Sequence, residues 1–273
     1  MMGGRIARCF SEAKSENRAV LGMFVSAGDP EAGLSEQILD VLASNGADFI
    51  ELGMPFSDPM ADGPAIQASS LRAIKAGMTL EKTLDIATRF RKNHPDTPLI
   101  LMGYFNPIYI YGTDRFLDAA AKAGVDGLII VDLPPEEDDE LCTPARQAGL
   151  DFIRLVTPTT LGDRLEVVLN NAGGFVYYVA IAGITGTKSA ETDSIKQAMT
   201  RINGATDLPC VTGFGIRTAE QAHQAAQVSD GVVVGSALVQ LIEDAAETNP
   251  LNHDRLLSDM GSFCAGLAAA MKR

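Results

Sequence analysis

Short apolar runs recur along the chain, separated by longer stretches in which apolar residues return every three or four positions. Near-continuous hydrophobicity is typical of parallel strands buried on both faces, and the longer period is typical of amphipathic helices. The apolar runs predict strands at Leu21–Ser26, Phe49–Gly53, Leu99–Gly103, Gly127–Asp132, Phe152–Val156, Phe175–Ala180, Cys210–Gly213 and Gly231–Gly235. The periodic stretches predict helices over 34–45, 79–92, 114–123, 136–148, 189–202 and 218–227.

Alternation of eight strands with helices favours a closed (β/α)8 barrel, the TIM barrel, over an open sheet. No GxGxxG motif follows the first strand, which weakens the alternative of a dinucleotide-binding sheet. No linker or composition break divides the chain, so we expect 1–273 to form a single (β/α)8-barrel domain. Arg5–Glu16 precedes the first strand, and we expect it to be a helix that caps the barrel floor.

The connection between the second and third strands is unusually long. It holds the loop sequence PFSDPMADGP and an additional predicted helix near 64–76. Loops that follow strands form the active-site face of such barrels. An enlarged second loop therefore marks the first place to search for chemistry.

Composition narrows the classes of partner. A formal charge of −13 argues against nucleic-acid binding, which depends on clustered Lys and Arg, whereas backbone N–H groups at helix starts still allow phosphate binding. No apolar stretch is long enough for a membrane span or a signal peptide, so we expect a cytoplasmic protein without membrane association. The cysteines, Cys9, Cys142, Cys210 and Cys264, are far apart and are expected to be reduced packing thiols.

Two carboxylates are candidates for acid–base chemistry. Glu51 lies inside an apolar strand, where desolvation should raise its pKa toward that of a useful general acid; pairing with Arg or backbone donors is the structural alternative. Asp62 lies in the enlarged loop, where Asp is more often a turn former, and it gains interest from sharing one barrel mouth with Glu51. Asp132 is a rival carboxylate for which helix or loop capping is the favoured interpretation.

Three glycine-rich loops are candidates for a phosphate site. GFGIRT (213–218) and VVGSALV (233–239) follow the seventh and eighth strands and lead into helices, where barrels often bind phosphate. AGITGTKS (182–189) follows the sixth strand and adds further donors. Each loop taken alone is also explained by the glycines that turns require. The prediction of a phosphate site therefore depends on three such loops lying on one side of the barrel.

The absence of certain motifs narrows the reaction. The histidines, at 94, 223 and 253, lie in no HxH or HExxH motif and at no strand end, so no metal site is expected. No lysine lies within a strand, so a Schiff-base mechanism lacks its nucleophile; Lys188 is the nearest exception, and a solvated role is expected for it. With metal and Schiff-base mechanisms disfavoured, the remaining candidate is metal-free acid–base chemistry on a phosphorylated substrate. Aromatic residues near strand ends are placed to wall a pocket or to pack in the core: Phe24, Tyr104, Tyr177 and Phe214.

The segment ELGMPFSDPMADGPAIQ (51–67) resembles the signature of the tryptophan synthase α subunits. Further matches, in the family's order, are FVSAGDP (24–30), LMGYFNPI (101–108), YYVAIAGITGTKS (177–189), GFGIRTAEQ (213–221) and VVGSALV (233–239). The resemblance covers roughly 5–245. It implies a barrel lyase of tryptophan biosynthesis that cleaves indole-3-glycerol phosphate to indole and glyceraldehyde 3-phosphate.

The resemblance also implies roles for individual residues. Glu51 matches the general acid/base that protonates indole C3, and Asp62 matches the carboxylate that binds the indole N–H. Thr185 matches a loop threonine that orders Asp62 on closure. The indole-pocket positions are matched by Phe24, Met102, Tyr104, Ile129 and Tyr177, and the backbone phosphate site is matched by Gly186, Gly215, Gly235 and Ser236. Phe214 is a further candidate substrate-binding residue because it lies near a strand end.

The same resemblance implies a partner. Pro55, Asp58, Asn106 and Pro107 match surfaces that face the β subunit in an α2β2 complex, which channels indole to pyridoxal phosphate in that subunit. No cofactor is expected in this chain. One departure is Ala180-Ile181-Ala182, where some members have polar or basic residues. The alternatives are another phosphate-binding barrel and an inactive subunit that only activates a partner enzyme; neither needs both Glu51 and Asp62.

Overall fold

The computed structural model describes residues 4–180, 188–213, 215–248 and 250–273, with the side chains of 188–192 left out. The strands are β1 (Val20–Ser26), β2 (Phe49–Gly53), β3 (Leu99–Gly103), β4 (Gly127–Ile130), β5 (Asp151–Phe152), β6 (Arg154–Val156), β7 (Val176–Val179), β8 (Cys210–Gly213) and β9 (Gly231–Val234). The helices are α1 (Arg5–Ser15), α2 (Ala32–Ser44), α3 (Pro64–Lys75), α4 (Leu80–Asn93), α5 (Phe105–Tyr111), α6 (Thr113–Ala123), the 3-10 helix η1 (Pro135–Glu140), α7 (Cys142–Gln147), α8 (Asp163–Leu169), α9 (Lys188–Asn203), α10 (Ala219–Ala226), α11 (Ser236–Ala246) and α12 (His253–Ala269).

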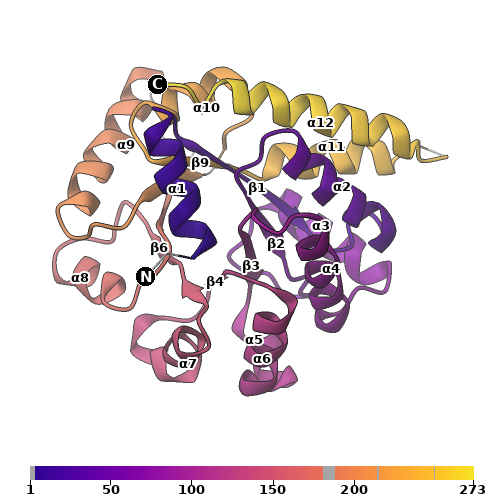
Figure 1. Ribbon diagram of the computed structural model, residues 1–273, viewed down its shortest axis with the longest axis horizontal. Coiled ribbons are helices and arrows are strands. Elements are labelled where there is room, and N and C mark those ends of the chain that lie inside the picture. Colours follow the sequence, from indigo (N-terminus) through magenta and orange to yellow (C-terminus); the bar gives the residue numbers. More distant parts are fainter. Residues whose placement is uncertain (1–3, 181–187, 214, 249) are drawn as a thin grey trace.

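All the strand pairs are parallel, and they form a nearly closed barrel surrounded by helices (Figure 1). The order is β5-β4-β3-β2-β1-β9-β8-β7-β6. The predicted fifth strand is split: β5 pairs with β4, β6 pairs with β7, and only Ile153 separates them along the chain. The chain itself thus joins the two edges of the sheet, and the predicted TIM barrel is confirmed.

Most predicted elements are present, with changes at their ends. The strands at Phe49–Gly53, Leu99–Gly103 and Cys210–Gly213 have the predicted bounds. The predicted helix over 136–148 is wrong as one element: η1 and α7 are separate, because five consecutive acidic residues (136–140) offer no apolar stripe to bury. The other predicted helices are present, whereas no residue range was predicted for α5, α8, α11 and α12.

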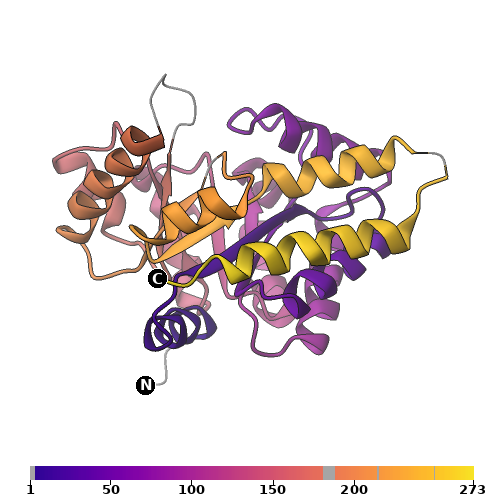
Figure 2. The same cartoon turned by 90° about the horizontal axis from the view of Figure 1, so that it is seen from above.

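The barrel interior is packed with apolar side chains, and α1 covers its floor (Figure 2). Phe10 of α1 meets Phe175, just before β7, at a ring-centroid distance of 5.6 Å, and Phe175 meets Phe49 of β2 at 5.3 Å. Arg5 adds an ion pair to Asp126, just before β4, at 2.9 Å. The helix predicted at the N-terminus therefore seals one end of the barrel, which leaves the other end for a site.

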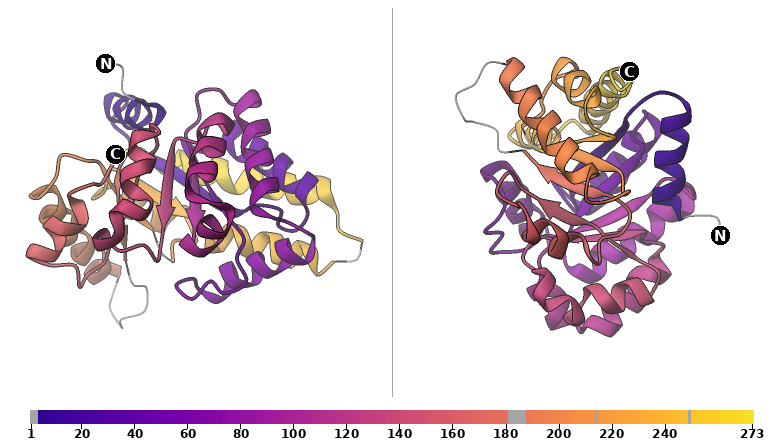
Figure 3. Two further views of the ribbon diagram at one scale, coloured as in Figure 1. Left: turned by 90° about the horizontal axis from the view of Figure 1, so that it is seen from below. Right: turned by 90° about the vertical axis from the view of Figure 1, so that its left-hand side faces the viewer.

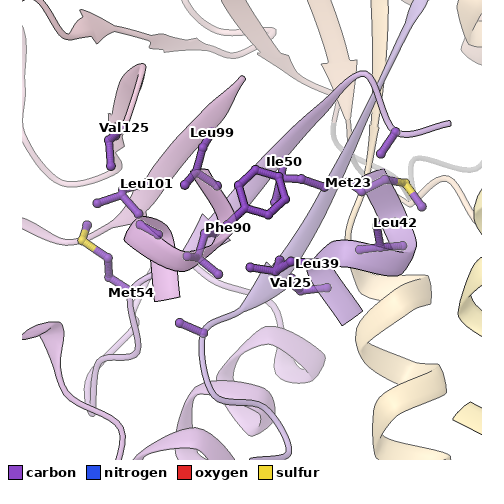
Figure 4. Close-up of a cluster of buried hydrophobic side chains, with 14 of the residues drawn as sticks. Met23, Val25, Leu39, Leu42, Ile50, Met54, Phe90, Leu99, Leu101 and Val125 are labelled. Carbon is purple, nitrogen blue, oxygen red and sulfur yellow. The ribbon is translucent and has the colours of Figure 1, made fainter. Parts of the chain in front are cut away.

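A larger apolar layer lies between the strands and the outer helices. Leu39 and Leu42 of α2 and Phe90 of α4 pack against side chains on the outer faces of β1, β2 and β3 (Figure 4). Alternate strand residues supply the two layers, because successive side chains of a strand point to opposite faces. Figure 3 shows from two further sides how the helices enclose the strands. This double packing holds the strand ends, and hence the mouth residues, in fixed positions.

We predict that Gly22→Ala destabilises the protein. Gly22 lies on β1 beside the ring of Phe49, and an added Cβ would overlap three ring atoms of this fully buried side chain. Overpacking of this kind typically costs about 1–3 kcal/mol of unfolding free energy. Urea unfolding measures the loss. Gly33→Ala is the matched control, since a Cβ at that helical position meets no atom within 4 Å; equal stability of the two variants would contradict the packing argument.

Candidate functional site

A pocket opens at the carboxyl ends of β1, β2 and β3. Phe24 of β1, Met102 of β3 and Tyr104 line it together with Asp62 from the enlarged loop. Ile66 and Ser70 of α3, and Val131 after β4, complete the walls. The pocket has apolar sides and one carboxylate at its rim, the composition expected for a small-molecule site.

Glu51 lies on the inner face of the barrel, and both its register partner Phe24 and Gly53 of its own strand line the pocket. Phe49 belongs to the barrel-interior cluster, so Glu51, two residues further along β2, points the same way. Its register partners are Phe24 of β1 and Ile100 of β3. Only 1% of Glu51 is exposed, and its Oε1 has no hydrogen-bond partner among the residues that the structure describes.

Burial raises the pKa of the Glu51 carboxyl to about 8, because the charged form loses its hydration and gains no compensating charge. The structural alternative, in which Arg or backbone donors pair with Glu51, finds no support in the described residues. At neutral pH the group is therefore mostly protonated. A neutral carboxyl group facing an apolar pocket can deliver a proton.

Asp62 lies in a different environment at the pocket rim. It is half-buried, and the loop approaches Tyr104, whose hydroxyl oxygen accepts a hydrogen bond from the Ala61 amide at 2.9 Å. Burial raises the pKa of Asp62, and a hydrogen bond from the same Tyr104 hydroxyl partly offsets this by favouring the carboxylate. The two acids are thus set apart: Glu51 has no stabilising donor, whereas Asp62 has one.

The predicted indole-pocket residues occupy two levels. Phe24, Met102 and Tyr104 line the pocket itself. Ile129 and Tyr177 lie deeper, in or against the barrel-interior cluster. The pKa of the Tyr177 hydroxyl is raised well above its usual value, first by burial and then by the proximity of Glu51, so Tyr177 lies near the acid rather than at the rim.

The candidate phosphate residues lie on loops at the same mouth. Gly215 is exposed and has φ +75°, a conformation that favours glycine. Gly235 directly precedes α11, which begins at Ser236, and no side chain caps this helix start in the described chain. Its first amides are placed to bind an anion. Thr185, Gly186 and Phe214, and with them Ile181 and Ala182 of the sequence departure, lie outside the described residues.

Asp132 is a capping residue, as the sequence suggested. Its exposed carboxylate accepts a hydrogen bond at 2.8 Å from the amide of Phe105, the first residue of α5. A carboxylate at a helix start is stabilised by the free amides and the helix dipole. The rival acid is therefore occupied with a structural contact outside the pocket.

The residues predicted to face a partner lie on two neighbouring connections. Pro55 and Asp58 belong to the enlarged loop, and Asn106 and Pro107 belong to α5; Asp58 and Asn106 are exposed, and the two prolines are half-buried. Sequence reasoning missed the large apolar side chains exposed beside them: Met60 (79% exposed), Tyr109 (66%) and Ile110 (76%). No role was assigned to these three side chains from the sequence, and the structure shows that they are exposed to solvent.

Sequence reasoning also missed Ile66, Ser70 and Val131, which line the pocket. Ile66 could have been found from the sequence, because it lies in the helix predicted directly after the enlarged loop.

Among the described residues no group of His, Cys, Asp and Glu is arranged to hold a metal ion. The described helices include none that is long and apolar enough to cross a membrane.

We predict that Glu51→Gln stabilises the protein above pH 4.5. In the folded protein the pKa of Glu51 is raised from 4.5 to about 8, so between these values the unfolded chain has released a proton that the folded chain retains. Wild-type stability should therefore fall relative to the variant by about 1.4 kcal/mol per pH unit as pH rises through this window. Urea unfolding at several pH values measures the difference. Curves that stay parallel from pH 4.5 to 8 would contradict the raised pKa.

Comparisons with known proteins agree with this geometry. Residues 10–268 match the family model described as tryptophan synthase alpha chain. The tryptophan synthase subunit alpha of Legionella pneumophila str. Paris superposes with a TM-score of 0.90 at 37% identity over 98% of each chain. A tryptophan synthase chain of M. tuberculosis superposes with a TM-score of 0.86 at 30% identity over 99% of each chain. The chain therefore belongs to the tryptophan synthase alpha chain family, whose members are lyases that cleave indole-3-glycerol phosphate.

Proposed function

We propose that Glu51 and Asp62 divide the acid–base work of indole-3-glycerol phosphate cleavage in this chain. The observation that carries the proposal is the buried Glu51 carboxyl, whose pKa of about 8 keeps it protonated at neutral pH beneath an apolar pocket. Two acids in contrasting environments can take contrasting roles. Glu51 donates the proton, and Asp62 remains an anion.

The reaction needs a proton because indole is a poor leaving group as an aromatic carbanion. Glu51 protonates C3 of the ring, which interrupts aromaticity and places positive charge on the ring nitrogen. The Glu51 carboxylate left by this transfer then accepts the proton of the hydroxyl on the adjacent side-chain carbon, and the oxygen electron pair forms the aldehyde of glyceraldehyde 3-phosphate. The C3–C3′ bond breaks, and its electrons restore the aromatic ring of indole.

Asp62 acts at the nitrogen side of the ring. Its carboxylate accepts the indole N–H and stabilises the positive charge that develops there, since an opposite charge in a partly desolvated pocket interacts strongly. Tyr104 supports this role, because its hydrogen bond favours the charged form of Asp62. Phe24 and Met102 provide the flat apolar walls that an indole ring requires.

The phosphate is held by backbone amides at the start of α11, with Gly235 and Ser236 in first contact and Gly215 beside them. A glycine at 235 also makes room for Phe24, because an added Cβ would lie 3.2 Å from the Phe24 side chain. Backbone donors also explain how a chain with net charge −13 binds an anion. Gly186 remains a proposed phosphate contact and Thr185 a proposed partner of Asp62 on the sequence resemblance alone, and Phe214 remains a proposed wall of the substrate pocket.

The two alternatives are less well supported. An inactive subunit that only activates a partner has no use for a buried acid that costs stability, yet Glu51 is in place. Another phosphate-binding barrel would explain the glycine-bounded start of α11 but not the presence of both Glu51 and Asp62 at the pocket.

We further propose that residues 1–273 form a single barrel domain.

A partner subunit follows from the family, and its arrangement is proposed here. The similar M. tuberculosis chain comes from a crystal structure of tryptophan synthase. We infer that this chain likewise joins a β subunit in an α2β2 complex, and that its contact surface includes Pro55, Asp58, Asn106 and Pro107. Met60, Tyr109 and Ile110 extend that surface with exposed apolar area. Pyridoxal phosphate is then bound by the partner, and both subunits act in the cytoplasm.

The proposal predicts that Glu51→Gln lowers kcat/KM for indole release from indole-3-glycerol phosphate by about 10²–10⁴-fold, the usual contribution of a general acid. The variant retains the shape of the side chain and loses the proton. Asp132→Asn is the matched control, since Asp132 caps α5 outside the pocket. A Glu51→Gln enzyme that keeps more than a tenth of wild-type activity would show that another group donates the proton.

For the partner surface, we predict that Ile110→Ser weakens binding of the β subunit at least about tenfold, as expected for a buried interface residue. A calorimetric titration with purified β subunit measures the affinity. Val167→Ser, which removes a 45% exposed side chain from α8, is the control. If both variants bind like wild type, the docking surface lies elsewhere, and the lyase assignment is unaffected.

A further inference from the structure

One arginine joins three elements beside the site. Arg72 of α3 donates from Nε and Nη2 to the two carboxylate oxygens of Asp29, at 2.8 and 2.9 Å. Its Nη1 donates to Glu243 of α11 at 2.9 Å. A planar guanidinium that binds one carboxylate with two parallel bonds fixes both distance and orientation.

Each joined element leads to a different part of the site. Asp29 follows β1, the strand that carries Phe24. α3 continues the loop that carries Asp62, and Ile66 and Ser70 of this helix line the pocket. α11, which contains Glu243, begins at the proposed phosphate seat and packs beside α3 (Figure 2).

The network is sufficiently buried to constrain these elements. The side chain of Asp29 is 0% exposed, so its carboxylate depends on Arg72 for compensation. The side chains of Arg72 and Glu243 are 21% and 28% exposed, so water screens them less than it screens surface pairs. Breaking this contact would leave an uncompensated buried charge and free α3 from α11.

We propose that Arg72 is a positioning residue that sets the separation between the indole end and the phosphate end of the substrate site. This inference rests on the proposed function, which places Asp62 at one end and the start of α11 at the other. Arg72 touches no substrate. It acts by locking α3, and with it the Asp62 loop, against α11.

If Arg72 sets the spacing of the two ends of the site, rather than only stabilising the fold, ligands of different length should respond differently to its loss. A ligand that reaches both ends gains affinity only while the two seats are correctly spaced, because the second contact is then made at a high effective concentration. A ligand that occupies one end is indifferent to the spacing. Loosening the α3–α11 contact should therefore weaken spanning ligands and spare fragments.

The experiment measures binding to Arg72→Met by calorimetry with three probes. One is an indole joined by an unsubstituted three-carbon chain to a phosphate, which spans the site and lacks the hydroxyl needed for cleavage. The others are indole and glycerol 3-phosphate, which occupy one end each. We expect at least about tenfold weaker binding of the spanning ligand and less than about twofold change for each fragment. For catalysis, KM should rise more than kcat falls.

Two further variants complete the design. Arg89→Met removes a comparable two-bond pair, from Arg89 of α4 to Glu36 of α2 at 2.8 and 2.7 Å, away from the pocket. Its binding should match wild type. Glu243→Gln leaves the Asp29 pair in place and weakens only the link to α11, so it tests the proposal even if Arg72→Met unfolds; we expect a smaller loss for the spanning ligand.

The outcomes are separable. The positioning role would be overturned if the affinities for the spanning ligand and for both fragments fell equally, or if neither Arg72→Met nor Glu243→Gln weakened binding of the spanning ligand. The proposed function would still stand in that case, provided that the wild-type protein cleaves indole-3-glycerol phosphate. Failure of wild-type protein to bind the spanning ligand at all would overturn both.

Discussion

The site depends on one unfavourable burial: an unpaired carboxyl group in the wall of an apolar barrel. Among the residues that the structure describes, Glu51 has no counter-charge, and burial raises its pKa to about 8. Any Arg or Lys placed beside it would stabilise the anion and remove its value as an acid. The surrounding packing must therefore supply enough stability to hold a group that lowers it, which is the usual relation between active sites and scaffolds.

Small residues in the barrel interior make room for the side chains that surround this acid. Gly22 accommodates the ring of Phe49, Gly213 faces the Tyr177 hydroxyl, and Gly53 lies beside Phe24. Alternation of glycine and aromatic residues fills the barrel below the mouth and excludes water from Glu51. The same low polarity that raises the pKa of Glu51 strengthens the interaction proposed between Asp62 and the ring.

Much of the fold was predictable because it depends on local pattern. Apolar runs located the strands, and the place of Glu51 within one of them predicted the burial and the raised pKa that the structure shows. Other features depend on contacts between distant segments. The bond between Ala61 and Tyr104, and the pair between Asp29 and Arg72, each join residues 43 positions apart, so no periodicity reveals them. The exposure of Ile110 was hidden for the opposite reason, since an apolar residue is normally taken for core.

The contrast between the two kinds of charged contact explains why the site is both precise and reactive. Asp29 is as buried as Glu51, yet it has a guanidinium and serves as an anchor. Glu51 has no such partner among the described residues, and we propose that it donates the proton. A carboxyl group in the position of Asp29 would be held as an anion by the guanidinium, and one in the position of Glu51 would be held neutral by burial. The protonation state therefore depends on the environment and not on the carboxyl group itself. The enlarged second loop connects them: it begins after the strand of Glu51, passes through Asp62, and continues into the helix that Arg72 locks to the rest of the barrel.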